Sequence, residues 1–477
     1  MKYALFIVLA LAAASPAAAQ DLRAQVQAKL SEAAAGTRFG LVVATQDGKE
    51  IVAIDPEGRY IPASNTKMFS TAVTFATNPD INAPDMAGGN AVRIEGRDVA
   101  LIGYGDARMS SAADCTVDCL ATLADAVAAK TKRVGDVIGD DTLFPDQRWS
   151  PGMSWNNIPT RSGTGISALT LDENEVELAV APGEVNKPAV VRLGSTYYTV
   201  DNRAVTVPGA VSKIGYDRLP FERVVRVTGT IGTDAKPDIS RMGIDDPAHF
   251  AAWRFKEMLE ARGVKVKGAV RVRHRAAAPM DDPTSGEAVV VRANDLPAPL
   301  ARLTPAPLGE DMKIINKISQ NLHAELALRR VGLRQGSGSL AFGVAEIEAM
   351  LREAGVARTA WDLSDGSGMS TYNRVAPRGV VQMLRWIAAK PWGAQWRDTL
   401  PIGGVDGTLR NRFKGTALEG KVFAKTGTLN ATNAVAGYMT AASGKELIFA
   451  FYANDIPADA SSTRIMDAVL NMVAAGN

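Results

Sequence analysis

From residue 38 onward the chain alternates apolar and polar positions. Residues 38–54 alternate as two paired strands do, and Asp47-Gly48 between them is typical of a hairpin turn. The spacing of apolar residues then becomes helical, and Pro62 and Ser64 mark the expected start of a helix. This pattern predicts a β-hairpin followed directly by a helix.

The pattern of apolar and polar residues changes in the middle of the chain. From about residue 90 to 290, short β-branched runs separated by turn residues predict strands, with two helical stretches between them. The expected strands lie at 92–103, 134–138, 176–181, 189–207, 224–231 and 264–274, and the expected helices at 118–131 and 247–262. A segment rich in Pro, Asp and Ala, 279–307, is expected to lead out of this region.

Helical periodicity returns in the last third of the chain. It predicts helices over 310–331 and 341–354, and a hairpin follows over 433–454 with its turn at Ser443-Gly444. A last helix carries one apolar stripe, which we expect to pack on this hairpin, because such a stripe is more often core than a membrane contact.

Length and composition are those of a multidomain globular protein. The 477 residues correspond to about three domains at ~150 residues each, and 46% hydrophobic with 22% charged residues excludes a disordered chain. The net charge of +2 is too small to favour binding of nucleic acid or anionic lipid by electrostatic attraction. The 3 histidines form no H-E-x-x-H, and neither a G-x-S-x-G nor a P-loop sequence occurs, so metal-dependent, Ser-His-Asp and nucleotide-dependent enzymes are disfavoured.

The N-terminus has the features of a secretory signal. Lys2 precedes a short apolar run, Pro16 breaks it, and an A-x-A cleavage site ends at Ala19. A membrane anchor would need about 20 apolar residues, more than this run contains, and nothing later is apolar enough to span a bilayer. We therefore expect residues 1–19 to be removed and the mature protein, without a transmembrane anchor, to be periplasmic.

Cys115 and Cys119 are the 2 cysteines of the chain. In an oxidising compartment so close a pair favours a local disulfide, and the alternative is two free thiols one turn apart on a helix. Two cysteines alone do not make a zinc site. In both cases we expect the role of the pair to be structural.

Ser64-Asn-Thr-Lys67 lies at the start of the first predicted helix. A spacing of three puts the hydroxyl of Ser64 and the ammonium of Lys67 on one helical face, close enough to hydrogen-bond. Serine needs a base to become a nucleophile, and a lysine with a lowered pKa can be that base where histidine is scarce. The S-x-x-K pattern alone is weak evidence, because an N-cap serine beside an exposed lysine has the same sequence.

Two later motifs strengthen the interpretation. Ser319-Gln-Asn321 lies in the helix expected over 310–331, and Lys425-Thr-Gly-Thr428 lies in an apolar, strand-like run before the last hairpin. The order S-x-x-K, S-x-N, K-T-G is the signature of penicillin-binding proteins and serine β-lactamases. A polar turn with the sequence D-G-S-G, residues 365–368, falls between the second and third motifs.

With these motifs the chain resembles the class C low-molecular-mass penicillin-binding proteins, the D-alanyl-D-alanine carboxypeptidase/endopeptidases of peptidase family S13. The resemblance extends from about residue 38 to 455 and is not confined to the motifs. The similar stretches are Tyr60 to Lys67, Gly103 to Asp106, Val137 to Asp141, Gly152 to Asn156, Leu400 to Leu409 and Ala424 to Leu429.

The family resemblance implies an α/β (α+β) transpeptidase/β-lactamase-like domain with large β-rich insertion domains. The catalytic domain would be discontinuous, at 20–85 and 300–477, and the inserted β-rich region at 86–299 would form two nested domains. Class A β-lactamases lack an insertion of that size and use a catalytic glutamate between S-x-N and K-T-G, for which we find no convincing counterpart. A serine β-lactamase-type hydrolase and a non-catalytic peptidoglycan-binding homologue are the alternatives.

The resemblance also implies the roles of the catalytic residues. Ser64 would attack the penultimate D-alanine of a peptidoglycan stem peptide, and Lys67 would take its proton, with Lys425 as the neighbour that lowers the pKa of Lys67. Ser319 would relay a proton to the leaving amine through Lys425 or Lys67. No cofactor or metal is required, and β-lactam antibiotics would be covalent inhibitors.

Substrate binding is implied in the same way. Asn321 would hydrogen-bond the substrate backbone, and the N–H groups of Ser64 and Thr428 would form the oxyanion hole. The terminal carboxylate would be bound by the K-T-G-T stretch, that is, by Lys425, Thr426, Gly427 and Thr428.

Two positions depart from the family pattern. Related enzymes often carry Asp after Trp-Asn in the insertion and Arg after D-G-S-G-L-S, where these residues help to recognise the charged end of a diaminopimelyl side chain. In this chain the two positions hold Asn157 and Thr371. Because an amide cannot form the same ion pair, we expect a weakened preference for that stem-peptide terminus.

Overall fold

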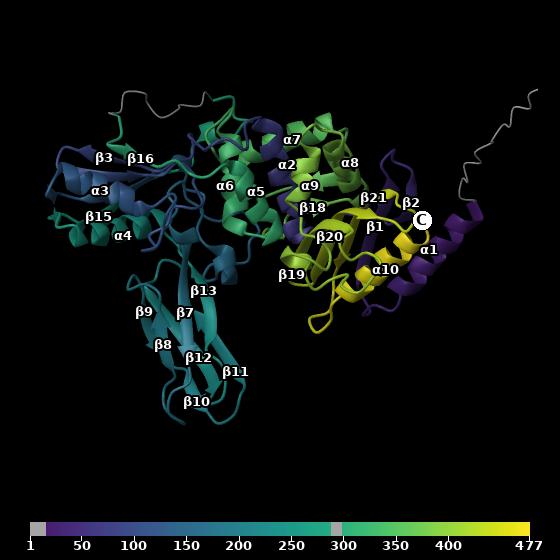
Figure 1. The fold of residues 1–477 in the computed structure, drawn as a ribbon, viewed down its shortest axis with the longest axis horizontal. Coiled ribbons are helices and arrows are strands. Elements are labelled where there is room, and N and C mark those ends of the chain that lie inside the picture. Colours follow the sequence, from purple (N-terminus) through teal and green to yellow (C-terminus); the bar gives the residue numbers. More distant parts are fainter. Residues whose placement is uncertain (1–15, 288–297) are drawn as a thin grey trace, which may run out of the picture.

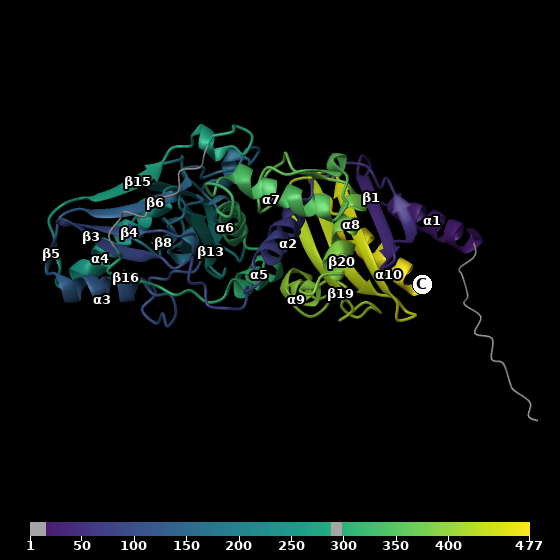
Figure 2. The same ribbon diagram turned by 90° about the horizontal axis from the view of Figure 1, so that it is seen from above.

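The computed structural model describes residues 16–287 and 298–477. Two lobes lie side by side along the long axis of the molecule, and an arm of β-strands projects sideways (Figures 1 and 2). The lobe that holds the C-terminus contains both ends of the described chain, and the other lobe and the arm come from its middle. The apolar run of the expected signal peptide lies outside the described residues.

The C-terminal lobe is built on a five-stranded antiparallel sheet with the order β19-β20-β21-β1-β2. Its strands are β1 Arg38–Thr45, β2 Glu50–Ile54, β19 Val422–Leu429, β20 Thr432–Thr440 and β21 Glu446–Asn454. Both predicted hairpins are present. Side chains alternate across the sheet, so that Val42 and Ala44 belong to one hydrophobic core and Leu41 and Val43 to another.

Helices cover both faces of this sheet. One face packs against α1 Pro16–Leu30 and α10 Thr463–Ala475, and the layer on the other face contains α2 Lys67–Thr77, α5 Leu308–Lys317, α6 Asn321–Gly332, α7 Leu340–Glu353, α8 Pro377–Ala388 and α9 Gly393–Asp398. The expected packing of the last helix on the last hairpin is confirmed, since Val469 and Val473 share a core with Val435 and Phe449. α1, α8 and α9 are absent from the predicted elements.

The second lobe contains a five-stranded mixed sheet with the order β15-β6-β4-β3-β16. Its strands are β3 Ala91–Glu95, β4 Asp98–Ile102, β6 Val137–Pro145, β15 Val270–Arg275 and β16 Ala301–Arg302, with a further short pair, β5 Arg133–Val134 and β14 Lys265–Val266. Two helices, α3 Leu120–Lys130 and α4 Pro247–Ala261, pack in the same core, so this lobe is α/β. Its sheet extends through β16, a little beyond residue 299, the expected end of the inserted region.

The arm consists of two small sheets. One has the order β13-β7-β8, and in the other β9, β10 and β11 all pair with β12. The strands are β7 Glu175–Ala181, β8 Val190–Leu193, β9 Thr199–Asn202, β10 Val205–Val207, β11 Ser212–Asp217, β12 Val224–Gly232 and β13 Asp238–Gly243. β11 and β13 are absent from the predicted strands.

The continuous helix expected over 310–331 is wrong, because the segment forms two helices. α5 ends at Lys317 and α6 begins at Asn321. Between them Ser319 has a φ of +64°, which is incompatible with a right-handed helix. Gln320 caps α6, since its side chain accepts a hydrogen bond from the N–H of Leu322. Ser319 therefore lies in a bend and not on a helical face.

Cys115 and Cys119 form a disulfide, which confirms the expected local bond over the alternative of two free thiols. The bond closes the loop that precedes α3. Within the two described ranges, no helix combines the length and the apolar character needed to cross a membrane.

Candidate active site

Ser64 lies in a 3-10 turn, η1 Ala63–Thr66, that leads directly into α2. Lys67 is the first residue of α2, and its Nζ lies 3.0 Å from the Oγ of Ser64. The spacing of three residues therefore produces the contact that the sequence suggested. Lys67 is fully buried, whereas Ser64 is partly exposed, so a substrate can reach the hydroxyl.

Two further oxygen atoms surround the Nζ of Lys67. It donates to the side-chain Oδ1 of Asn321 at 2.7 Å and to the main-chain oxygen of Ser367 at 2.5 Å. Burial lowers the pKa of Lys67 to about 7, although the carboxylates of Asp365 and Glu325 act in the opposite direction. A substantial fraction of Lys67 is therefore the neutral amine near neutral pH.

Asn321, the first residue of α6, is held from both sides. Its Nδ2 donates to the main-chain oxygen of Ser162, 3.0 Å away in the inserted region. Because a main-chain oxygen can only accept, this contact turns the Oδ1 of Asn321 toward Lys67. The inserted region therefore helps to orient a group that contacts the candidate base.

Lys425 and Ser319 form a second pair. The Nζ of Lys425 donates to the Oγ of Ser319 at 2.9 Å and to the main-chain oxygen of Thr426 at 2.9 Å. Lys425 is fully buried, and burial together with the charge of Lys67 lowers the pKa of Lys425 well below its usual value. Burial is the first cause of the lowered pKa of both lysines, and the two buried amines also lie close enough for the charge of one to affect the pKa of the other.

β19 runs beside the turn that holds Ser64. A Cβ atom on Gly427 would lie 2.4 Å from the main-chain oxygen of Pro62 and 3.1 Å from the nitrogen of Ser64, so the approach requires a glycine. Of the two threonines that flank Gly427, Thr426 is partly buried and Thr428 is exposed. The K-T-G-T stretch thus forms one wall of the site.

The D-G-S-G loop forms another wall, although its sequence alone indicates no role for it. Ser367 supplies the main-chain oxygen that binds Lys67. Gly368 has a φ of +88°, and a Cβ there would lie 1.9 Å from the main-chain oxygen of Ala63. The loop can therefore touch the serine turn only through a glycine. The contact of Lys67 with the main-chain oxygen of Ser367 does not depend on the side chain of Ser367, so no sequence motif indicates it.

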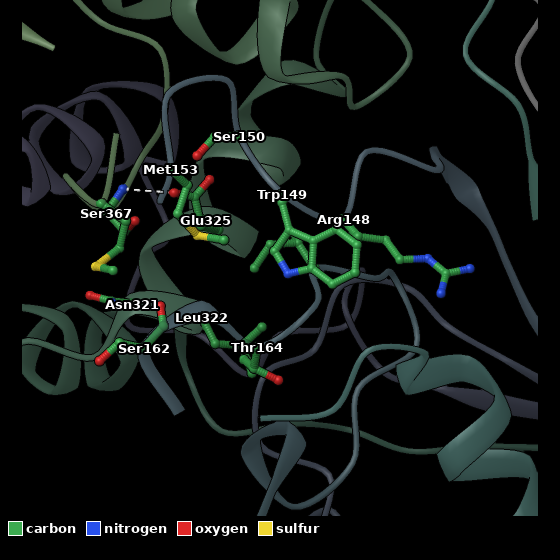
Figure 3. Close-up of a pocket in the computed structure, with 12 residues that line it drawn as sticks. Arg148, Trp149, Ser150, Met153, Ser162, Thr164, Asn321, Leu322, Glu325 and Ser367 are labelled. Atoms are coloured by element: carbon green, nitrogen blue, oxygen red, sulfur yellow. Dashed lines mark hydrogen bonds between the residues drawn. The ribbon is translucent and has the colours of Figure 1, made fainter. Parts of the chain in front are cut away.

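A cavity opens beside Asn321 and Ser367 (Figure 3). The inserted region, α6 and the D-G-S-G loop line it together, with Trp149, Met153, Ser162, Leu322 and Met369 among the lining residues. Glu325 of α6 also lines it and accepts hydrogen bonds from the N–H groups of Gly366 and Ser367 at 3.0 and 2.9 Å. The carboxylate thereby fixes the loop whose main-chain oxygen contacts Lys67.

Asn157 and Thr371 lie on two loops that contact each other. Asn157 ends the 3-10 turn η2 Trp155–Asn157. Thr371 follows the D-G-S-G loop, and its hydroxyl donates to the main-chain oxygen of Gly152 at 3.0 Å. The loop of Asn157 is therefore tied to the loop of Thr371 by a neutral hydrogen bond.

Similarity to known proteins extends over almost the whole chain. The model of the D-Ala-D-Ala carboxypeptidase 3 (S13) family matches residues 22–475. A D-alanyl-D-alanine carboxypeptidase of Actinomadura sp. (strain R39) is 34% identical over 470 residues, which cover 93% of this chain and 83% of the relative. The D-alanyl-D-alanine carboxypeptidase DacB of Haemophilus influenzae is 26% identical over 334 residues, covering 67% of this chain and 65% of the relative.

Solved structures with the same fold also cover nearly all of the chain. The crystal structure of penicillin binding protein 4 (dacB) from Haemophilus influenzae has a TM-score of 0.77 at 20% identity and covers 94% of this chain and 97% of that chain. A structure of the same protein complexed with a novel β-lactam has a TM-score of 0.72 at 20% identity and covers 94% and 98%. The expected transpeptidase/β-lactamase-like fold is confirmed.

Proposed function

Because this chain belongs to the D-Ala-D-Ala carboxypeptidase 3 (S13) family, we propose that it is a periplasmic serine-type D-Ala-D-Ala carboxypeptidase of peptidoglycan. Its substrate is the stem peptide that ends in two D-alanines, and Ser64 forms the acyl-enzyme. The observation that carries the proposal is the contact between the hydroxyl of Ser64 and the buried amine of Lys67.

The hydrogen bonds around Lys67 support its role as the general base. A neutral amine has two N–H donors and one lone pair, and the oxygens of Asn321 and Ser367 can only accept. These oxygens engage both donors, so the lone pair faces the third neighbour, the hydroxyl of Ser64 at 3.0 Å. Ser64 gives its proton to Lys67 while its Oγ attacks the carbonyl carbon of the penultimate D-alanine.

The negative charge that develops on the carbonyl oxygen is stabilised by the N–H groups of Ser64 and Thr428. The close approach of Gly427 to the backbone of Ser64 supports this pairing, because it puts the strand and the serine turn at one point. Removing a donor of an oxyanion hole typically costs on the order of 10²–10³ in rate.

Lys425 and Ser319 act on the leaving D-alanine. The terminal carboxylate binds to Lys425 with Thr426 and Thr428, and its negative charge favours the protonated, cationic form of the buried Lys425. When the C–N bond breaks, Ser319 gives a proton to the leaving nitrogen and takes one from Lys425. The 2.9 Å contact between Lys425 and Ser319 favours this route over one through Lys67.

Asn321 holds Lys67 and also binds the substrate. In the free enzyme its Nδ2 donates to the main-chain oxygen of Ser162. A carbonyl of the incoming peptide backbone takes the place of this oxygen as acceptor, so the Oδ1 keeps its contact with Lys67.

Water hydrolyses the acyl-enzyme ester and releases the shortened peptide. When the leaving amine belongs to a cross-linking peptide, the same step is endopeptidase activity. A β-lactam carries a strained amide and a carboxylate in the arrangement of a D-Ala-D-Ala end. Penicillin therefore acylates Ser64 and leaves a stable adduct.

The proposed function includes a division into domains and export of the protein from the cytoplasm. Residues 20–85 and 300–477 form the catalytic domain, and 86–299 form the inserted region with two nested domains. The separate sheets of the second lobe and the arm support this division. Residues 1–19 are removed when the protein is exported.

Labelling with a fluorescent penicillin tests the nucleophile. We expect the wild-type protein to be labelled and the Ser64→Ala variant to remain unlabelled. Ser162→Ala is a matched control, because it removes an exposed hydroxyl near the site and keeps the main-chain oxygen that binds Asn321. Labelling of Ser64→Ala would disprove the assignment, and rapid turnover of penicillin would favour the β-lactamase-type alternative.

Mass spectrometry of muropeptides digested by the purified protein tests the substrate. Loss of the terminal D-alanine identifies carboxypeptidase activity, and loss of cross-links identifies endopeptidase activity. Muropeptides left intact by a protein that binds penicillin would contradict the proposed reaction.

A further inference from the structure

A short turn of the inserted region, η4 Asp172–Asn174, has three consecutive residues in the left-handed conformation. Their φ values are +51°, +54° and +52°. Asp and Asn adopt this conformation more readily than most residues with a side chain, but the central residue of the turn is Glu173. A strained backbone of this kind persists only where the surrounding structure determines it, and such residues cluster at functional sites.

Side-chain hydrogen bonds hold this turn on both sides of Glu173. The carboxylate of Asp172 accepts from the N–H and the hydroxyl of Ser111 at 2.8 and 2.6 Å. The amide of Asn174 donates to the main-chain oxygen of Gly165 at 3.1 Å. These bonds fix the backbone of the turn without using the side chain of Glu173, which extends to the C-terminal lobe instead.

The carboxylate of Glu173 binds the start of α6. Its Oε2 accepts a hydrogen bond from the Nε2 of Gln320 at 2.8 Å. Its Oε1 lies 3.5 Å from the Nε2 of His323, whose side chain is fully buried. The contact with His323 lowers the pKa of Glu173, although burial acts in the opposite direction. Glu173 is therefore a charged carboxylate near the N-terminus of α6, where the helix dipole favours negative charge.

Gln320 connects Glu173 to the S-x-N motif, of which it is the middle residue. Its Oε1 accepts from the N–H of Leu322 at 3.1 Å and so caps α6, while its Nε2 donates to Glu173. Gln320 is almost fully buried. Both ends of its amide are engaged, so the contact from the inserted region fixes the chain at the bend between α5 and α6.

The two residues that flank Gln320 depend on this contact to different extents. Asn321 is also held by the main-chain oxygen of Ser162. Ser319 has a left-handed φ of +64° in the bend, and its Oγ accepts a hydrogen bond from the Nζ of Lys425 at 2.9 Å. The alignment of the Ser319 hydroxyl therefore depends more on Gln320 than the alignment of Asn321 does.

We propose that Glu173 is a positioning residue that keeps Ser319 aligned to deliver a proton to the leaving amine. It acts through Gln320, from the far side of the bend. This inference rests on the proposed function, in which Ser319 gives a proton to the leaving nitrogen and takes one from Lys425. Without the carboxylate, the bend loses its support from the inserted region, whereas Ser64 keeps its contact with the candidate base.

The identity of the leaving group separates this role from a general effect on the active site. The nitrogen of an amine must receive a proton as the C–N bond breaks. In a thioester analogue of the substrate, sulfur replaces this nitrogen, and the C–S bond breaks to release a thiolate. A thiol has a pKa of about 8.5, so the thiolate leaves without a proton donor. Loss of Glu173 must therefore slow cleavage of the peptide and spare the thioester.

Steady-state kinetics of Glu173→Ala tests the proposal with a stem pentapeptide and its thioester analogue, which share the acyl group and the terminal carboxylate. We expect kcat/KM for the peptide to fall about tenfold or more and kcat/KM for the thioester to stay within about threefold of wild type. Glu177→Ala removes an exposed carboxylate of the adjacent strand β7 and is the matched control, which should change neither substrate.

Reversing the direction of the hydrogen bond provides a rescue. Gln320→Glu keeps an oxygen that caps α6 but places a second carboxylate against Glu173, so cleavage of the peptide should fall. Adding Glu173→Gln introduces an amide that can donate to this carboxylate, and kcat/KM for the peptide should return to within about threefold of wild type. Failure of the second substitution to restore cleavage would contradict the proposed pairing.

The ratio of the two substrates distinguishes positioning from loss of folded protein. Both rates are measured on the same preparation, so a misfolded fraction lowers them equally and leaves their ratio unchanged. An equal loss on both substrates, or no loss on either, would overturn the role of Glu173. Wild-type protein that leaves the pentapeptide intact would instead overturn the proposed function.

Discussion

The side-chain oxygen of Asn321 lies 2.7 Å from the Nζ of Lys67, and the amide nitrogen of the same residue binds the inserted region. One amide therefore connects the candidate base with the part of the chain that lines the cavity. Because an amide is neutral, it takes up a donor of Lys67 without stabilising the charged form of the lysine as a carboxylate would.

Replacing this amide by a carboxylate should weaken the base. In Asn321→Asp the new negative charge raises the pKa of Lys67 by about one to two units, so less neutral amine is present at pH 7. We expect acylation by penicillin at pH 7 to fall about tenfold and to recover at about pH 9. Stopped-flow labelling across this pH range measures the effect.

Asn321→Ala is the control for this substitution, because it removes the amide without adding charge. This variant should slow acylation at every pH, and the midpoint of its pH–rate profile should not move to higher pH. If Asn321→Asp and Asn321→Ala gave the same profile, the electrostatic explanation would fail.

The wild-type profile follows from the lowered pKa of Lys67. With a pKa of about 7, the lysine is mostly protonated below that pH and has no lone pair for the Ser64 proton. Acylation should therefore rise with pH through about 7 and level off above it. Lys67→Arg keeps the charge and removes the base, so we expect a loss of about 100-fold or more. A flat rate between about pH 5.5 and 8.5 would show that Lys67 is not the group that titrates.

We predict that penicillin labelling requires a glycine at position 368. A side chain there would clash with the serine turn, in addition to straining the left-handed φ. A Cβ in Gly368→Ala would lie 1.9 Å from the main-chain oxygen of Ala63, next to the active serine. Gly415→Ala is a matched control, since Gly415 has a φ of +72° and nothing within 4 Å of its Cβ position. Gly415→Ala should cost about 1–2 kcal/mol of stability because of its left-handed φ alone. Gly368→Ala should cost more because of the added backbone clash, and only Gly368→Ala should lose penicillin labelling. Equal labelling of the two variants would contradict the tight packing of the D-G-S-G loop on the serine turn.

The neutral residues Asn157 and Thr371 should make the enzyme indifferent to a charged diaminopimelyl end. We expect the wild-type protein to cleave stem pentapeptides with a free or an amidated diaminopimelyl centre at similar kcat/KM. The double variant Asn157→Asp, Thr371→Arg should prefer the free form by about tenfold or more, because each new ionic hydrogen bond contributes about 1.5–3 kcal/mol. Thr371→Ser keeps the hydroxyl that binds Gly152 and serves as the control. A strong wild-type preference for the free form would refute this prediction.

The sequence was sufficient for those parts of the site that depend on local spacing. Ser64 and Lys67 meet because residues three apart share a helical face, and Lys425 lies in the strand that its apolar neighbours indicate. The two hairpins were predictable for the same reason, since strand alternation and a turn residue are both visible in a short window.

Contacts between distant segments and contacts made by main-chain atoms could not be predicted from the sequence pattern. The segments before and after Ser319 both have helical apolar periodicity. A sequence window that includes both segments therefore predicts one continuous helix, whereas the structure has two helices separated by the bend at Ser319. The Ser367 contact to Lys67 uses a main-chain oxygen, which every residue type possesses. The pKa of Lys67 depends on burial by segments far apart in the chain, and no motif spacing encodes that burial.

The pairing of β1 with β21 imposes an order on the biosynthesis of this enzyme. Strand β1, Arg38–Thr45, leaves the ribosome long before its partner β21, Glu446–Asn454. The central sheet therefore stays open until β21 has been synthesised, and a nascent chain at that stage can carry the nucleophile without Lys425. The active site can therefore assemble only after β1 has paired with β21. Because these strands are far apart in the chain, this step closes a very long loop and is expected to be slow.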